Sequence, residues 1–203
     1  DAVVIHGPPA RFVGRGAEKL DHALAIFDID VTGRRALDVG ASTGGFTDVL
    51  LAHGASKVYA VDVGHGQLVE RLRADPRVID LSGCDARALR SSDVPEAVSA
   101  ITADVSFVSL TQALRPALKH AGPGAWVIGL VKPQFEVGRG EIGKGGIVRD
   151  SQARARALDK VADQLGAAGD RDAEASRLSD QLSRAQDLRD RLGRLQRTME
   201  ELK

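Results

Sequence analysis

Short apolar runs rich in Val and Ile alternate with helix-like segments along most of this chain, and this alternation limits the possible fold more than any other feature. Such a rhythm is typical of βαβ units, in which crossover helices join parallel strands. It predicts an α/β fold with a doubly wound parallel sheet and helices on both faces. The expected strands are 34–40, 57–63, 77–83, 100–108 and 125–133, and the expected helices are 44–54, 67–75, 111–124 and 151–169.

The first expected strand ends in a glycine-rich turn, DVGASTGGFT, at residues 38–47. Ligands of open α/β sheets bind beyond the carboxyl ends of the strands, so a ligand is expected at this turn. Gly40, Gly44 and Gly45 do not fit the G-x-G-x-x-G pattern of dinucleotide binders, which argues against a pyrophosphate cofactor. Asp62 closes the second expected strand about 20 residues further on, where a carboxylate can accept hydrogen bonds from both hydroxyls of a ribose.

S-adenosylmethionine fits these features. Its adenosine is expected at Asp62, and its methionine part is expected at the Asp38 carboxylate and at the backbone of residues 40–45. The alternative is that the glycines serve only to let the first helix pack closely against the sheet.

Charged residues at the ends of other expected strands are the candidates for catalysis. Asp104, in TADVSF, and Lys132, in LVKPQF, both follow apolar strands, so their side chains are expected at the same sheet edge as the cofactor. Lys19, in GRGAEKL, precedes the first strand and is a third candidate. A lysine beside a second ammonium can take a proton from a hydroxyl, and a carboxylate can orient that lysine. The alternative is that these charges are solvated ends of strands.

Five motifs, in this order, resemble those of the TlyA-type, or hemolysin A-type, branch of the FtsJ-like RNA methyltransferases. They are FVGRGAEKL, LDVGASTGGFTDVLL, VDVGHGQL, ADVSFVSL and LVKPQFEVGRGEIGKGGIVRD, and the resemblance covers residues 11–168. It implies a Rossmann-like, S-adenosylmethionine-dependent 2′-O-methyltransferase of ribosomal RNA, with rRNA or ribosomal subunits as partners and a cytoplasmic location.

The family's catalytic set is Lys-Asp-Lys-Glu, and its first three members fall on Lys19, Asp104 and Lys132. The resemblance implies that Lys132, assisted by the other two, removes the proton of the target 2′-hydroxyl as that oxygen attacks the methyl group in line. No metal is expected, because a sulfonium is already an activated leaving group. The implied cofactor contacts are Asp38, Gly40, Ser42, Gly44, Gly45, Asp62 and Asp85.

The two ends of the chain depart from the family. Residues 1–14 are expected to be the remnant of an N-terminal S4-type RNA-binding domain or a linker, and 15–169 the methyltransferase domain. Because the first residue is Asp rather than Met, we expect a trimmed N-terminus. In 170–203, a charged segment stands where the family has its last strands and its catalytic Glu; Glu136 belongs to another motif and is not assigned that role.

The charged segment predicts a helix in place of terminal strands, because its apolar residues follow a heptad spacing. This helix is expected to cover the open sheet edge or to form a homodimer. A catalytically impaired cofactor-binding module is therefore the alternative to an active enzyme. The heptad residues are Leu188, Leu192, Leu195, Met199 and Leu202.

The glycine-rich segment 132–150 is the expected RNA contact. Its cationic side chains alternate with glycines and could grip phosphates around the target ribose, and its flexibility suits a lid. The alternative is a solvated connection to the next helix. The expected RNA-binding residues are Arg15, Arg139, Lys144 and Arg149.

Several other classes of function are disfavoured. The chain has 28 basic and 28 acidic residues, so no global field attracts it to nucleic acid or to an anionic membrane. A membrane-lytic, hemolysin-like protein needs an amphipathic or spanning segment, and none is visible outside the charged tail. The five histidines show no metal-ligand spacing with Cys84, and that single cysteine fits a reducing compartment. Phe107 and Trp126 are expected in the core.

Overall fold

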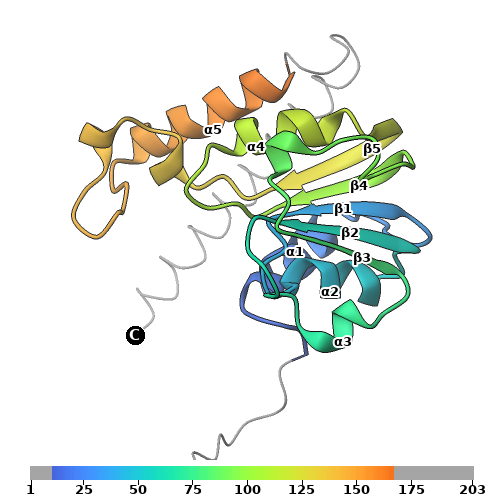
Figure 1. Cartoon of the computed structure of the whole chain (residues 1–203). Helices are drawn as coiled ribbons and strands as arrows, with labels where there is room; N and C mark the ends of the chain where they lie inside the picture. Colours follow the sequence, from blue (N-terminus) through green and yellow to red (C-terminus); the bar gives the residue numbers. More distant parts are fainter. Residues whose placement is uncertain (1–10, 167–203) are drawn as a thin grey trace, which may run out of the picture. The chain divides into compact units, whose positions relative to one another are not determined.

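The computed structural model describes residues 11–166, so the heptad-patterned tail and residues 1–10 lie outside the described part. Five parallel strands form one sheet in the order β3-β2-β1-β4-β5 (Figure 1). This confirms the predicted parallel sheet. The strands are β1 Arg35–Val39, β2 Lys57–Asp62, β3 Val78–Ser82, β4 Val98–Ala103 and β5 Ala121–Gly129.

The helices cover the two faces of this sheet, as the sequence predicts. Figure 1 shows α1, α2 and α3 on one face and α4 on the other. The helices are α1 Gly16–Ile26, α2 Gly45–Ala52, α3 Glu70–Arg73, α4 Leu110–Leu118 and α5 Ser151–Gly166, with short 3₁₀ turns η1 Ala86–Ala88, η2 Pro133–Phe135 and η3 Arg139–Glu141.

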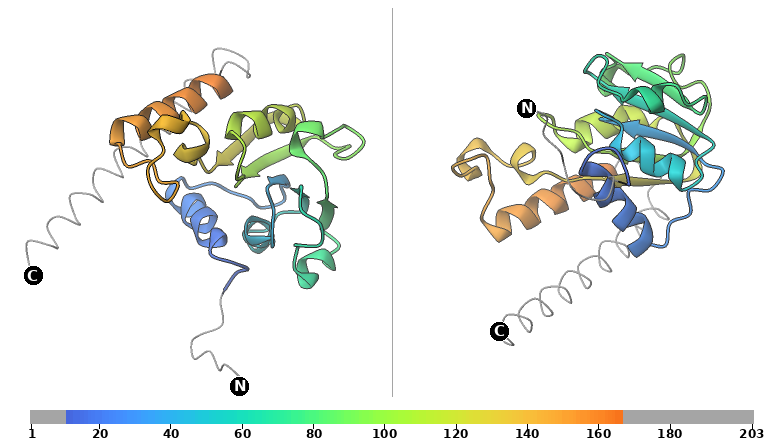
Figure 2. Two further views of the ribbon diagram at one scale, coloured as in Figure 1. Left: turned by 60° about the vertical axis from the view of Figure 1, so that its left-hand side comes forward. Right: turned by 90° about the horizontal axis from the view of Figure 1, so that it is seen from below.

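The chain divides, within α5, into two compact units, which are residues 1–157 and 158–203. The sheet and all the candidate site residues discussed below belong to the first unit. Within that unit, the segment between η2 and α5 projects beyond the strands in both views of Figure 2, where it is drawn in gold.

The middle of the sheet is where the strand order reverses. β1 pairs with β2 on one side and with β4 on the other, so Val39 lies beside both Val61 and Ala103. The turn that follows β1 therefore emerges between the carboxyl ends of two neighbouring strands. This is the place where open α/β sheets bind their ligands.

The core under α1 and α2 is built from aliphatic side chains at helical and strand spacing. In α1, Ala17, Leu20 and Leu24 are buried, three and four residues apart, and they pack with Val49 and Leu50 of α2. α1 is not among the helices expected from the sequence, although its buried residues follow a helical spacing there.

Three expectations about local structure are wrong. α3 spans only Glu70–Arg73, shorter than the expected 67–75. Residues 121–124 begin β5 instead of ending α4, and the glycines there lie where the β4–β5 register shifts. Phe107 is not in the core: β4 stops at Ala103, and the Phe107 side chain is 92% exposed in the loop that follows. Trp126 does pack against the core, as expected.

Candidate active site

The glycine-rich turn after β1 is shaped by close packing. Gly40 has a φ of +84°, and a Cβ there would lie 2.7 Å from the carbonyl oxygen of Asp104. Gly44 has a φ of +101°, and a Cβ there would lie 2.3 Å from Cδ1 of Leu72. At Gly45 the nearest atom would be the carbonyl oxygen of Val13, at 2.9 Å. An added side chain would therefore crowd neighbouring atoms at each of these three glycines.

A pocket of about 550 Å³ opens at this turn. Its volume is within the range of small-molecule sites. The pocket is lined by the glycine-rich turn, by Asp104 and by Lys19 of α1. The sequence-predicted residues that line it are Arg15, Lys19, Gly40, Ser42, Gly45 and Asp104.

The Asp62 carboxylate joins two loops at the edge of this site. Its Oδ2 accepts a hydrogen bond from the backbone N–H of Ser42 at 2.8 Å, and its Oδ1 accepts one from Gly64 at 2.7 Å. A carboxylate oxygen can accept a second hydrogen bond, so Asp62 keeps the capacity to receive ribose hydroxyls. Ser42 also donates its hydroxyl to Oε1 of Gln67 at 3.2 Å.

Asp38 supports the turn from beneath. Its side chain is fully buried, and its two oxygens accept hydrogen bonds from the hydroxyls of Thr47, at 2.7 Å, and Thr102, at 3.0 Å. Burial raises the pKa of Asp38 to about 6, the two threonine hydrogen bonds oppose that rise, and the nearby charge of Asp104 adds slightly to it. The structure therefore places Asp38 behind the turn, between β1, α2 and β4.

Lys132 and Asp104 meet at the carboxyl edge, as their positions after β5 and β4 predict. The Lys132 Nζ atom lies 2.7 Å from Oδ1 of Asp104, and both side chains are about four-fifths buried, at 23% and 20% exposed. The same Nζ donates a hydrogen bond to the hydroxyl of Ser106 at 2.7 Å. A Cβ on Gly16 would lie 3.6 Å from the other Asp104 oxygen, so the first turn of α1, which precedes Lys19, also faces this carboxylate.

The buried side chain of Glu136 links the segment that carries Lys132 to the segment that follows Asp104. Glu136 follows η2 and accepts hydrogen bonds from the hydroxyl of Ser109 and from the backbone N–H of Leu110, both at 2.7 Å. It thereby caps the start of α4.

Phe107, which the sequence predicts to lie in the core, is instead an exposed aromatic side chain in the loop that follows Asp104. The ring centroid of Phe107 lies 5.4 Å from that of Phe135, and Phe107 has a φ of +65°, which is rare for an aromatic residue. Its place in the loop after β4, three residues beyond Asp104, can be read from the sequence. Its exposure cannot, because it depends on where β4 stops.

The remaining predicted residues lie outside the pocket. Asp85 follows β3, caps η1 and pairs with Arg87 at 2.6 Å. Arg139, Lys144 and Arg149 are exposed on the projecting segment. Lys144 lies in a tight turn that the Gly143 N–H closes on the Ile147 carbonyl at 3.0 Å.

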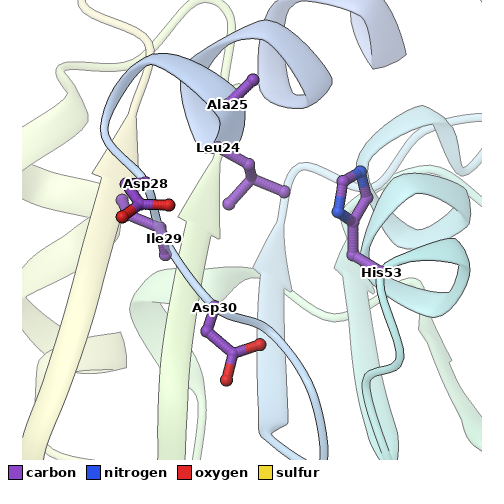
Figure 3. Close-up of a pocket in the computed structure, with 6 residues that line it drawn as sticks. All are labelled: Leu24, Ala25, Asp28, Ile29, Asp30 and His53. Carbon is purple, nitrogen blue, oxygen red and sulfur yellow. The ribbon is translucent and has the colours of Figure 1, made fainter.

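A second pocket, of about 420 Å³, lies where the strands begin. Five of its lining residues come from the end of α1 and the segment after it, and His53 comes from the end of α2 (Figure 3). Nε2 of His53 lies 2.7 Å from a carboxylate oxygen of Asp21. Between residues 11 and 166, no group of three or more His, Cys, Asp or Glu side chains is arranged to hold a metal ion. No helix in that part of the chain has the length and apolar character needed to cross a membrane.

A parallel sheet of this order, with a pocket at its strand-order reversal, places the chain in the class of Rossmann-like α/β proteins. More specifically, the model of the FtsJ-like methyltransferase family matches residues 12–170, and the chain belongs to that family.

Individual relatives carry related names. The chain is 52% identical over 151 residues to the 16S/23S rRNA (cytidine-2'-O)-methyltransferase TlyA of Mycobacterium tuberculosis, covering 74% of this chain and 56% of the relative. It is 43% identical over 156 residues to Hemolysin A of Brachyspira hyodysenteriae, covering 76% of this chain and 65% of the relative. The chain thus spans less than two thirds of either relative.

A solved structure of a hemolysin-like protein from Streptococcus thermophilus has the same fold. It superposes with a TM-score of 0.77 at 44% identity, over 81% of this chain and 60% of that one.

Proposed function

We propose that the protein is an S-adenosylmethionine-dependent methyltransferase that modifies the 2′-hydroxyl of a ribose in ribosomal RNA, at ribosomal subunits in the cytoplasm. The observation that carries this proposal is the Lys132–Asp104 ion pair of 2.7 Å, because Asp104 lines the same pocket as Lys19. The name of the M. tuberculosis relative, an rRNA (cytidine-2'-O)-methyltransferase, supports the choice of substrate.

The pocket residues suit this cofactor. The turn from Gly40 to Gly45 lines the pocket with backbone and small side chains, and Asp62 has acceptor capacity left for ribose hydroxyls. When bound, S-adenosylmethionine supplies an activated methyl group, and the residues below supply the rest.

Lys132 is the group that takes the proton from the target hydroxyl. Its Nζ is held by Asp104 on one side, and Lys19 supplies a second positive charge at the same pocket. Only the uncharged form of a lysine can accept a proton. Asp104 then stabilises the ammonium that Lys132 becomes.

Exposed side chains around this edge are suited to hold the RNA. Phe107 offers an exposed ring on which a splayed-out base can stack, a contact that is worth about 1–3 kcal/mol per base. The cationic residues that we expect at the phosphates are Arg15, Arg139, Lys144 and Arg149.

The test is transfer of a labelled methyl group from S-adenosylmethionine to ribosomal subunits or to rRNA, with the protein in excess so that slow turnover is detected. The Asp104→Asn and Lys132→Ala variants are expected to lose transfer and to keep cofactor binding, measured by calorimetry. Lys119→Ala, at the exposed end of α4, is the matched control and is expected to behave like the parent.

Two outcomes separate the candidate functions. Label that is found at a 2′-oxygen, above the background of Asp104→Asn, supports the methyltransferase. Background incorporation by the parent with normal cofactor affinity would instead support the cofactor-binding module.

A further inference from the structure

The two segments that leave β4 and β5 stay together beyond the ends of these strands. A backbone hydrogen bond still joins them at the Leu130 N–H and the Ala103 carbonyl, at 2.8 Å. Past this point both strands have ended, and side chains join the segment 104–110 to the segment 132–136. The separation of the two segments therefore depends on how strong these side-chain contacts are.

Two of these contacts lie at the surface. The Lys132 Nζ atom donates a hydrogen bond to the exposed hydroxyl of Ser106, at 2.7 Å. The rings of Phe107 and Phe135 lie 5.4 Å apart between centroids, and the Phe107 side chain is exposed. Polar contacts at a surface exchange with contacts to water and contribute little by themselves. These two contacts alone are expected to hold the segments loosely.

The contact at Glu136 is different, because it is buried. The Glu136 side chain is 5% exposed, and it accepts hydrogen bonds from the Ser109 hydroxyl and from the Leu110 N–H, both at 2.7 Å. Hydrogen bonds to a carboxylate are roughly twice as strong as those between neutral groups, and burial strengthens them further. Glu136 is thus the firmest of the three links between the segments.

A short hydrogen-bonded turn connects Glu136 to Lys132. The Phe135 N–H donates to the Lys132 carbonyl at 2.9 Å, and the Glu136 N–H donates to the Pro133 carbonyl at 3.0 Å. The ring of Pro133 restricts the backbone of this turn further. A displacement of Glu136 is therefore expected to move Lys132 and Phe135 with it.

We propose that Glu136 is a positioning residue, which holds Lys132 and Phe107 at a fixed separation. The nucleotide whose base stacks on Phe107 then presents its 2′-hydroxyl to Lys132. This inference rests on the proposed function. Phe107 lies two residues before Ser109, and Lys132 lies four residues before Glu136, so the carboxylate joins the group that holds the base to the group that takes the proton. Without the carboxylate, the surface contacts remain, and the two groups can move apart.

The first measurement concerns the protein alone. The chain has five phenylalanines, so fluorine-labelled phenylalanine gives few NMR signals, and Phe107→Leu and Phe135→Leu assign the two of interest. In Phe135→Leu, the Phe107 signal shows the position of that ring without its partner. Glu136→Ala is expected to shift the Phe107 signal of the folded protein toward this position. A loss of stability alone would not move the signal of the folded state.

Three further variants make this measurement specific. Glu136→Gln keeps an oxygen for the Leu110 N–H, and its amide can donate to the Ser109 hydroxyl, so the parent signal is expected. Ser109→Ala removes one of the two hydrogen bonds, gives a smaller shift, and replaces Glu136→Ala if that variant does not fold. Asp75→Ala is the matched control: Asp75 precedes β3 and accepts from the Arg77 N–H at 2.9 Å and from its guanidinium at 2.7 Å.

The second measurement is the single-turnover rate of labelled methyl transfer to rRNA. Glu136→Ala is expected to slow the rate at saturating RNA about tenfold, because the base and the lysine are no longer aligned. The RNA concentration at half-maximal rate is expected to change less than about twofold, since phosphate contacts supply most of the affinity. Glu136→Gln is expected to recover most of the rate, and Asp75→Ala to keep the parent rate. The affinity for the cofactor is expected to stay unchanged in all of these variants.

The outcomes for Glu136 and for the proposed function can be told apart. A parental Phe107 signal in Glu136→Ala and Ser109→Ala, or a parental rate in Glu136→Ala, would overturn the role of Glu136. An equal loss of rate in Asp75→Ala would also overturn it, because general destabilisation would then explain the effect. If the parent itself transfers no methyl group, the proposed function fails, while the fluorine signals still decide whether Glu136 holds the two segments together.

Discussion

The Asp38 carboxylate lies at the end of β1 with none of its surface exposed, and its two oxygens are bound by threonine hydroxyls from α2 and β4. Asp62 and Asp104, at the ends of the flanking strands, use their oxygens differently: the first binds backbone N–H groups of two loops, and the second binds an ammonium. All three acids could be assigned to the site from their positions after apolar strands. Their separate tasks could not, because burial and hydrogen-bond partners come from residues distant in the sequence.

The buried Asp38 gives the protein a predictable pH dependence. The folded chain holds its proton up to about pH 6, whereas the unfolded chain releases it near the ordinary value of 3.8. Rising pH between these values therefore favours the unfolded state, and the stability that the neutral acid provides is lost by about pH 6. The difference between the two pKa values corresponds to roughly 3 kcal/mol.

The side chain in Asp38→Asn stays neutral at every pH, so this variant is expected to lack the loss of stability that the parent shows as the pH rises. Denaturant unfolding at several pH values between 4 and 7 should show the parent losing stability relative to the variant as the pH rises. Asp28→Asn, at an exposed carboxylate, serves as the control and should follow the parent. Curves for parent and Asp38→Asn that run parallel over this range would show that Asp38 is charged in the folded protein.

Asp62 is expected to determine cofactor affinity. Asp62→Ala removes the acceptor for the ribose hydroxyls and also the hydrogen bonds to the Ser42 and Gly64 backbone, so we expect S-adenosylmethionine to bind at least tenfold more weakly by calorimetry. Asp80→Ala is a matched control, because Asp80 makes a similar backbone hydrogen bond, to Ser82 at 2.9 Å, in the middle of β3. Equal affinities of Asp62→Ala and parent would remove Asp62 from the site.

At the scale of elements, the site depends on how the segments at the carboxyl edge are fastened together. Asp48 of α2 accepts a hydrogen bond from the Val13 backbone at 2.9 Å and binds Arg71 of α3, which holds the segment before α1 against both helices. The strands and their order of appearance could be predicted from Val- and Ile-rich runs. The exposed position of Phe107 could not, because it is set by contacts between two loops that are far apart in the sequence.

Gly44 tests how much the glycine-rich turn depends on packing. Gly44→Ala places a methyl group against Leu68 and Leu72, where a Cβ would lie 2.7 Å and 2.3 Å from side-chain carbons, and the backbone φ is +101°. Strain and overpacking together are expected to destabilise the protein by about 2–4 kcal/mol in urea unfolding. Gly33→Ala is the control for strain alone, because φ is +69° there but no atom lies within 4 Å of the added Cβ.

The two glycine variants distinguish the explanations for the turn. If Gly44→Ala lowers the free energy of unfolding by no more than Gly33→Ala does, packing does not explain why residue 44 is a glycine. If Gly44→Ala remains stable and loses cofactor affinity, the turn is bare because of the ligand.

The two edges of the sheet are the places where the molecule could pair with another chain. In the part of the chain that the structure describes, the sheet ends at β3 on one side and at β5 on the other. An unpaired strand edge is a surface on which other chains can pair, and natural proteins cover or block such edges. The residues that we propose for cofactor binding lie between Asp38 and Asp85, on the strands farther from β5. Cofactor binding and self-association should therefore depend on separate parts of the chain.

A chain that ends after Gly169 tests this separation. The heptad spacing of apolar residues in 170–203 predicts a helix that pairs with a second copy, so we expect the full chain to be a dimer by light scattering and the shortened chain to be a monomer. S-adenosylmethionine is expected to bind both chains with equal affinity, because residues 38–85 are intact in each. A shortened chain that aggregates would indicate that the tail covers the β5 edge instead of forming a dimer. A full chain that is already monomeric at high concentration would show that the heptad pattern does not mediate self-association.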